Sequence, residues 1–289
     1  MTSPPSETPA AFEHTTDHFT SSNSRRLFEQ WWRPQIEPKA AMVIVHGYAE
    51  HSGRYGHVGA HLAGCGYAVG TYDLRGHGRS EGKRAFIRQF DEHIQDLRTF
   101  LNRVAQTIPD KPVFLFGHSL GGAIAVLYSI THQPALQGLL LSGAALKISE
   151  DISPLLQKLS GIIGTLFPTL PTIKLDSNWL SRTPEVVRQY DSDPLVYRKG
   201  TLAGTGLEIL RATEHIQAKM EAVQLPLLIL HGSADRVTDP QGSRQLYERA
   251  QAADKTLTIY DGLYHELLNE PEQATVLQEM TAWMDQRIY

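Results

Sequence analysis

The stretch Val113-Phe-Leu-Phe-Gly-His-Ser-Leu-Gly-Gly-Ala-Ile-Ala-Val-Leu-Tyr128 contains the pattern Gly-x-Ser-x-Gly at residues 117–121. The apolar run before the pattern predicts a buried strand, and the run after it predicts a helix over residues 122–129. A serine on the sharp turn between a strand and a helix is the setting of a nucleophile elbow. Glycines are needed there because such a turn leaves no space for Cβ atoms around a strained serine. We therefore identify Ser119 as the candidate nucleophile, with the positive end of a helix dipole beside it.

Strands and helices alternate on both sides of this stretch. Helical patterns occur near residues 58–63, 90–107 and 271–287, and residues 26–32 predict an early strand. Continuous apolar runs, typical of strands buried on both faces of a sheet, occur at 41–46, 67–72, 139–141, 227–230 and 257–260. The alternation predicts an α/β fold with a mostly parallel, doubly wound sheet that is covered by helices.

One long segment interrupts the alternation. About eighty residues separate the strand that ends near 141 from the strand that begins at 227, too many for a single crossover. The first part of this segment carries an apolar stripe at helical spacing that includes Leu155, Leu159 and Ile162. We predict an inserted helical cap at 148–210, a core formed by 13–147 and 211–289, and a disordered tail at 1–12.

Composition excludes several classes of protein. Of the 289 residues, 41% are hydrophobic and 20% are charged, a balance typical of a globular domain. The formal net charge of -4 offers no basic surface to nucleic acid. Cys65 is the only cysteine, which excludes an intrachain disulfide and a thiolate metal cluster. No spacing of histidines and carboxylates is typical of a metal site, so we expect neither a metal nor a cofactor.

Targeting signals are also missing from the sequence pattern. Residues 1–11 have neither a basic start nor an apolar run, so we expect no secretory signal. No stretch approaches the roughly 20 apolar residues of a membrane-spanning helix. We expect a cytoplasmic protein that is at most peripheral to a membrane.

A serine hydroxyl needs a base to accept its proton and an acid to orient that base. In folds with a nucleophile elbow the partners follow in the order serine, acid, histidine. Asp235 follows the strand at 227–230, and His265 lies in the loop after the strand at 257–260. The rival acid, Asp239, precedes Pro240 and has the pattern of a helix N-cap, so we assign Asp235 as the acid and His265 as the base.

Other histidines compete for the role of base. His118 is adjacent to the nucleophile, and a residue next to the serine on the elbow cannot readily face it. His46, His77 and His231 lie in turns, where we expect structural hydrogen bonds.

The oxyanion donors are predicted from strand ends. His46-Gly-Tyr48 follows the strand at 41–46, where the first donor belongs. We assign the backbone N–H groups of Tyr48 and Leu120, each worth about 3 kcal/mol in the transition state. The alternative is an ordinary strand-to-helix turn. The loop from Asp73 to Ser80 lacks phosphate-loop spacing, so we interpret Asp73 and Arg75 as residues that tie loops together.

From about residue 28 to the C-terminus the chain resembles the monoacylglycerol lipase family, the serine aminopeptidase S33 group of α/β-hydrolases. The resemblance is carried by residues 46–55, 117–125, 190–194 and 232–236. It implies the α/β-hydrolase fold and the same three catalytic residues. It also implies that Glu50, Arg54, His118 and Tyr190 shape a pocket for a glycerol head group, the alternative for these four being structural hydrogen bonding.

Two positions depart from the family pattern. Tyr48 stands where the mammalian enzymes have a small residue, which affects access to the acyl pocket. Thr238 stands where mammalian relatives have a cysteine near the acid, so we expect thiol reagents to inhibit only weakly.

The resemblance implies hydrolysis of monoacylglycerols to glycerol and fatty acid. Leu155, Leu159 and Ile162 would enclose the acyl chain, and the cap would also contact a membrane surface shallowly and reversibly. Packing of the stripe on the core is the alternative. A lysophospholipase, a broad carboxylesterase, an aminopeptidase and a non-catalytic member of the fold are the rival functions. Acyl-chain length, regiospecificity and oligomeric state stay open.

Overall fold

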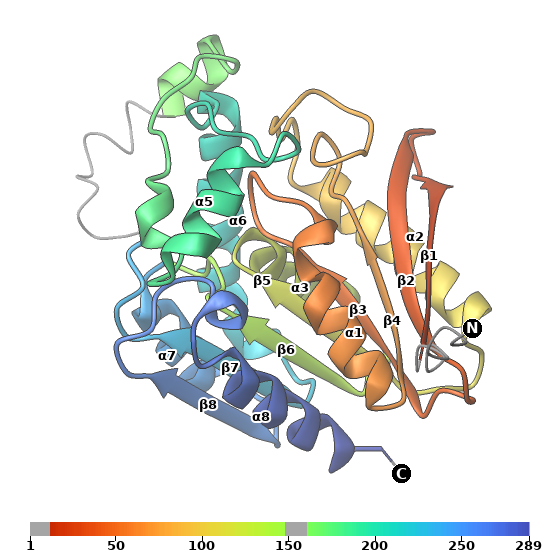
Figure 1. Ribbon diagram of the computed structural model, residues 1–289. Coiled ribbons are helices and arrows are strands. Elements are labelled where there is room, and N and C mark those ends of the chain that lie inside the picture. The colour runs from red at the N-terminus through yellow and green to blue at the C-terminus, as the bar shows by residue number, and fades with distance from the viewer. Residues whose placement is uncertain (1–11, 148–160, 289) are drawn as a thin grey trace, which may run out of the picture.

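The computed structural model describes residues 12–147 and 161–288, and a single sheet runs through its centre (Figure 1). The strand order is β1-β2-β4-β3-β5-β6-β7-β8. β1 pairs antiparallel with β2 and β2 with β4, whereas every other neighbouring pair is parallel. The strands are β1 (Phe12–Thr20), β2 (Arg26–Pro34), β3 (Ala40–Val45), β4 (Tyr67–Tyr72), β5 (Val113–His118), β6 (Gly138–Ser142), β7 (Leu227–Gly232) and β8 (Lys255–Tyr260). The mostly parallel sheet predicted from the alternation is confirmed.

Helices cover both faces of the sheet. The longer ones are α1 (Gly56–Gly64), α2 (Asp91–Thr107), α3 (Leu120–His132), α5 (Pro184–Ser192), α6 (Ala203–Lys219), α7 (Pro240–Arg249) and α8 (Gln273–Asp285). Single turns of 3-10 helix among the described residues are η1 (Ser52–Tyr55), η2 (Ser177–Trp179), η3 (Met220–Ala222) and η4 (Leu267–Asn269). α1 and α8 pack on one face, and α2, α3, α6 and α7 contribute to the core on the other (Figure 1).

β3 shows why the central strands are continuous apolar runs. Val43 and Val45 point into the core under α2 and α3, while Met42 and Ile44 point into the core under α1 and α8. All four side chains are fully buried. Because successive residues of a strand point to opposite faces, a sheet covered on both sides requires apolar residues at every position.

β1 is the strand that the sequence pattern did not predict. It is an edge strand paired only with β2, and most of its side chains are exposed. An exposed edge requires no apolar alternation, so residues 12–20 carry a weak signal. Phe12 begins this strand, although the predicted tail extended to residue 12.

The segment between β6 and β7 contains α5 and α6 and lies beyond the end of β5 (Figure 1). The boundary predicted at 210 falls inside α6, which continues to Lys219 and buries Ile216. Contacts tie the segment to the loop after β3: His51 pairs with Asp193 at 2.8 Å, and the backbone N–H of Tyr197 donates to the carbonyl oxygen of Ala49 at 2.8 Å.

Within residues 12–147 and 161–288, no helix combines the length and the apolar character needed to cross a membrane.

Candidate active site

Ser119 occupies the turn between β5 and α3 in a backbone conformation that residues other than glycine rarely adopt. Its φ of 54° and ψ of -118° lie outside the helical and extended regions. The neighbouring glycines make this turn possible, since a Cβ at Gly121 would collide with the carbonyl oxygen of Val45 and one at Gly117 with the backbone of Gly121. The turn thus has the geometry predicted from the Gly-x-Ser-x-Gly pattern.

Asp235 and His265 meet beside Ser119 although they come from different loops. Asp235 follows β7, His265 follows β8, and Nδ1 of His265 lies 2.8 Å from Oδ2 of Asp235. Oδ1 of Asp235 accepts the backbone N–H groups of Val237 at 2.7 Å and Thr238 at 3.0 Å. Burial alone would raise the pKa of Asp235, but His265 and His231 hold it well below its usual value. The carboxylate therefore stays ionised.

The structure also places the rival acid. Asp239 is the N-cap of α7, where its side chain accepts the backbone N–H of Gln241 at 2.8 Å. Pro240 begins the helix. The structural role predicted for Asp239 is confirmed.

The ring of His265 is buried and carries a perturbed pKa. Burial favours the neutral ring, but the charge and hydrogen bond of Asp235, with Glu266 and Glu50, raise the pKa of His265 above its usual value. His118 lies against it, with ring centroids 4.7 Å apart. Burial, followed by the charge on His265, lowers the pKa of His118 to about 4, so His118 is neutral.

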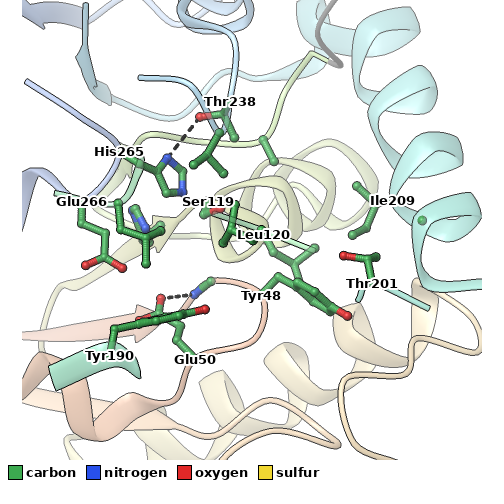
Figure 2. Close-up of a pocket in the computed structure, with 17 residues that line it drawn as sticks. Tyr48, Glu50, Ser119, Leu120, Tyr190, Thr201, Ile209, Thr238, His265 and Glu266 are labelled. Atoms are coloured by element: carbon green, nitrogen blue, oxygen red, sulfur yellow. Dashed lines mark hydrogen bonds between the residues drawn. The ribbon is translucent and has the colours of Figure 1, made fainter. Parts of the chain in front are cut away.

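Ser119 and His265 line the same cavity, with Ser119 beside the histidine ring (Figure 2). In the described part of the chain, no hydrogen bond joins the serine hydroxyl to that ring. Catalytic hydrogen bonds are often long in the absence of substrate and shorten in the reacting complex.

The loop after β3 is held so that its backbone faces the cavity. His46 donates from Nδ1 to the carbonyl oxygen of Gly47 at 2.7 Å and accepts the N–H of Leu74 at Nε2. The N–H of Gly47 donates to Oε1 of Glu50 at 2.6 Å. Among described residues, the N–H groups of Tyr48 and Leu120 have no acceptor, and both residues line the cavity.

The cavity has a volume of about 330 Å³ and two chemically different ends (Figure 2). Glu50, Tyr190 and Glu266 lie on one side of Ser119. Tyr48, Thr201 and Ile209 lie on the other side, and Ala145, Gly206 and Val237 also line the cavity. The apolar end and the polar end meet at the serine.

Buried charges form the polar end. Nη1 of Arg54 donates to Glu50 at 2.8 Å and to Glu266 at 2.6 Å, while Nη2 donates to Glu266 at 2.7 Å. The guanidinium also lies over the ring of Tyr190, 4.9 Å from its centroid. Burial would raise the pKa of Glu50, but Arg54 and neighbouring histidines lower it to about 2. Both carboxylates therefore stay ionised around a single guanidinium.

The residues predicted to bind substrate lie in different places relative to the cavity. Glu50, His118 and Tyr190 line the cavity, and Arg54 supports it from behind through the carboxylates. Ile162 is 58% exposed and does not line the cavity. Leu155 and Leu159 lie outside the described residues.

Glu266 is a charged cavity residue that sequence reasoning missed. It follows His265 directly, but its partner Arg54 is 212 positions earlier in the chain. The one available signal was an acidic residue beside the catalytic histidine. In the described part of the chain, no group of three or more histidines, cysteines or carboxylates could hold a metal ion.

An elbow serine after a central parallel strand, followed by an aspartate and a histidine after later strands, defines a serine hydrolase of the α/β-hydrolase fold. Comparison with known families places it more narrowly. The family model described as serine aminopeptidase, S33 matches residues 36–272, and the chain belongs to that family.

Known relatives cover nearly the whole chain. A monoacylglycerol lipase of Mycolicibacterium smegmatis is 37% identical over 92% of this chain and 95% of its own length. The monoglyceride lipase of Homo sapiens is 34% identical over 99% of this chain and 95% of its own length. The crystal structure of a monoacylglycerol lipase of Paleococcus ferrophilus superposes with a TM-score of 0.79, with 30% identity and coverage of 95% and 99%.

Proposed function

We propose that this serine ester hydrolase cleaves monoacylglycerols to glycerol and free fatty acid through an acyl-enzyme. The observation that carries the proposal is the position of Ser119 between a polar and an apolar end of one cavity. A glycerol head group fits hydrogen-bonding side chains, and an acyl chain gains up to ~0.8 kcal/mol for each buried CH₂. The names of the most similar relatives support the same substrate class.

The first half-reaction uses all three catalytic residues. Ser119 attacks the ester carbonyl carbon while Nε2 of His265 accepts the hydroxyl proton. Asp235 holds Nδ1 of His265 at 2.8 Å and stabilises the imidazolium that forms. The N–H groups of Tyr48 and Leu120 stabilise the negative oxygen of the tetrahedral intermediate. His265 then protonates the leaving glycerol oxygen, and the acyl-enzyme remains.

The second half-reaction reverses these roles. Water enters where glycerol left, His265 removes a proton from it, and the resulting hydroxide attacks the acyl carbon. The collapsing intermediate takes the proton back onto the Ser119 oxygen and releases the fatty acid. The apolar end holds the acyl chain during both steps.

Charges at the polar end argue against two rival functions. A lysophospholipid brings a phosphate, but both terminal nitrogens of Arg54 already donate to Glu50 and Glu266. An aminopeptidase needs carboxylates for a substrate ammonium, and here the two carboxylates share the guanidinium. A neutral head group fits this balance best, with Tyr190 and His118 beside it.

Membrane contact is the finer part of the proposal. Among the described residues between β6 and β7, six large apolar side chains are exposed, which favours shallow insertion into a lipid surface. They are Ile162, Leu166, Phe167, Leu170, Ile173 and Trp179. Co-sedimentation with phosphatidylcholine vesicles tests it: Phe167→Asp with Ile173→Asp should lower the bound fraction and leave hydrolysis of a short soluble ester unchanged.

The substrate proposal is tested by two rate constants. We expect kcat/KM for a long-chain monoacylglycerol to exceed that for a lysophosphatidylcholine of the same acyl chain by at least about tenfold. Ser119→Ala should abolish both activities and labelling by a fluorophosphonate. Equal rates would leave a general esterase, and activity that survives in Ser119→Ala would overturn the catalytic assignment.

A further inference from the structure

His231 is a second histidine in contact with Asp235. Its Nε2 is 3.1 Å from Oδ2 of Asp235, the same oxygen that accepts Nδ1–H of His265 at 2.8 Å. The His231 side chain is fully buried at the end of β7. Sequence reasoning gave this histidine a structural hydrogen bond and no link to catalysis.

The tautomer of His231 follows from its partners. An ionised carboxylate only accepts hydrogen bonds, so Nε2 of His231 must carry the proton that faces Asp235. Nδ1 of the neutral ring then accepts the hydroxyl of Ser243, which lies 2.7 Å away on α7 and is itself fully buried. Asp235 thus sets which nitrogen of His231 donates, and Ser243 holds the ring in this orientation.

Asp235 receives a full set of donors. Oδ1 accepts two backbone N–H groups, and Oδ2 accepts His265, His231 and the hydroxyl of Thr238 at 2.8 Å. Of these donors only His265 changes its charge during the reaction. Donors that share Oδ2 withdraw electron density from it, which weakens its hold on the proton of His265.

We propose that His231, oriented by Ser243, is a positioning residue that limits how strongly Asp235 binds the proton of His265. This inference rests on the proposed function only in taking Asp235 and His265 as catalytic. It matters because the base must be neutral to accept the serine proton, and Asp235 favours the charged ring. His231 keeps the carboxylate of Asp235 oriented toward His265 and reduces the extent to which this carboxylate favours the protonated ring.

Other charged groups face the same histidine and must stay constant in a test. His118 on β5 contacts the His265 ring, and Glu266 and Glu50 act on it from the polar end, with Arg54 between them. At the start of α7, Asp239 pairs with Lys147 at 3.2 Å. None of these groups is altered by substitutions at His231 or Ser243.

The experiment measures the second-order rate of Ser119 labelling by a fluorophosphonate between about pH 5 and pH 9. This readout needs an activated serine but no particular ester substrate. Variants are His231→Leu, His231→Gln and Ser243→Ala. The matched control is His93→Leu, because His93 is a fully buried histidine on α2 whose ring nitrogens find no hydrogen-bond partner among the described residues.

The acid limb of the pH–rate profile is the range in which labelling slows as His265 becomes protonated. We expect His231→Leu to move this acid limb to higher pH by about half a unit and to slow labelling about tenfold. His231→Gln retains an N–H donor, so its limb should stay with the parent and its rate within about threefold. Ser243→Ala should shift the limb in the same direction by less. His93→Leu should leave the limb unchanged.

An acid limb that does not move in folded His231→Leu, or equal losses in the Leu and Gln variants, would overturn the proposal. Thermal unfolding identifies a misfolded variant. If His231→Leu does not fold, an unshifted limb in Ser243→Ala overturns the proposal and a shifted one supports it. A parent that labels but does not cleave monoacylglycerols contradicts the substrate alone, and a parent that does not label overturns both assignments.

Discussion

Arg54 and Glu266 form a two-point ion pair across 212 positions of the chain, with hydrogen bonds of 2.6 and 2.7 Å. Glu50 takes a further bond from the same guanidinium at 2.8 Å. Two ionised carboxylates and one cation leave the polar end of the cavity with an excess of negative charge. Because this end is buried, the excess charge should repel an anionic head group.

We therefore expect Glu266→Gln to relax discrimination against anionic esters. The ratio of kcat/KM for a monoacylglycerol phosphate to that for the matching monoacylglycerol should rise about tenfold. Glu270→Gln is the control, since Glu270 is also a buried glutamate bonded to an arginine, Arg182, but does not line the cavity. The prediction fails if both variants change the ratio equally.

The pH dependence of the parent enzyme follows from His265. Asp235 raises the pKa of His265 above its usual 6.5. The base accepts a proton only when neutral, so kcat/KM should fall as pH decreases through a pKa above 6.5. Asp235 remains ionised throughout this range because its own pKa is well below the usual value.

A pH profile of kcat/KM on a neutral ester measures this limb. Asp235→Asn provides the contrast, because without the carboxylate the imidazolium loses its partner and kcat should fall about 10⁴-fold. An acid limb below pH 6 in the parent would contradict the raised pKa of His265.

The sequence was sufficient for features that follow from local patterns and strand order. Val113–Phe116 is a buried strand, the elbow serine follows it, and the catalytic acid and histidine come after later strands. Because the carboxyl ends of parallel strands lie at the same edge of a sheet, the strand order also predicted that Asp235 and His265 lie at one edge. The N-cap pattern alone was enough to identify Asp239 as a structural residue and leave Asp235 as the catalytic acid.

Contacts between particular side chains could not be predicted from the sequence. Nothing in the sequence pairs Arg54 with Glu266, because that contact depends on how loops from separate parts of the sheet pack. His231 and Asp235 are only four positions apart, but the sequence does not show that the histidine ring at the end of β7 turns toward the aspartate in the following loop. β1 was missed for a different reason: an exposed edge strand carries no apolar alternation. Ile162 belongs to an apolar stripe, yet periodicity cannot tell whether a stripe faces a cavity or solvent.

Tyr48 should set the preferred acyl-chain length. Its ring lies at the apolar end near Thr201 and Ile209 (Figure 2), and its hydroxyl donates to the carbonyl oxygen of Ala85 at 3.1 Å. The ring also packs edge-on against His77 at 5.6 Å, so it occupies a fixed volume. Tyr48→Ala would free this volume and keep the backbone N–H.

On p-nitrophenyl esters of increasing length, we expect the kcat/KM optimum of Tyr48→Ala to move to longer chains. Each further buried CH₂ contributes up to ~0.8 kcal/mol, or about fourfold in kcat/KM. Tyr48→Phe retains the ring and should keep the parent optimum. The same optimum in Tyr48→Ala and Tyr48→Phe would refute the role of the ring.

The position of the only cysteine predicts weak inhibition by thiol reagents. Cys65 ends α1, where its sulfur lies 3.9 Å from Nε2 of His61, and it does not line the cavity. Thr238 does line the cavity, and its hydroxyl lies 2.8 Å from Oδ2 of Asp235.

A maleimide at modest concentration should therefore leave the parent enzyme active, whereas Thr238→Cys should be inactivated because a bulky adduct would form beside His265. Each protein is compared with its own untreated rate, since a thiol is a weaker donor than a hydroxyl. Cys65→Ala should behave like the parent, and strong inactivation of the parent that Cys65→Ala abolishes would show that Cys65 controls the site.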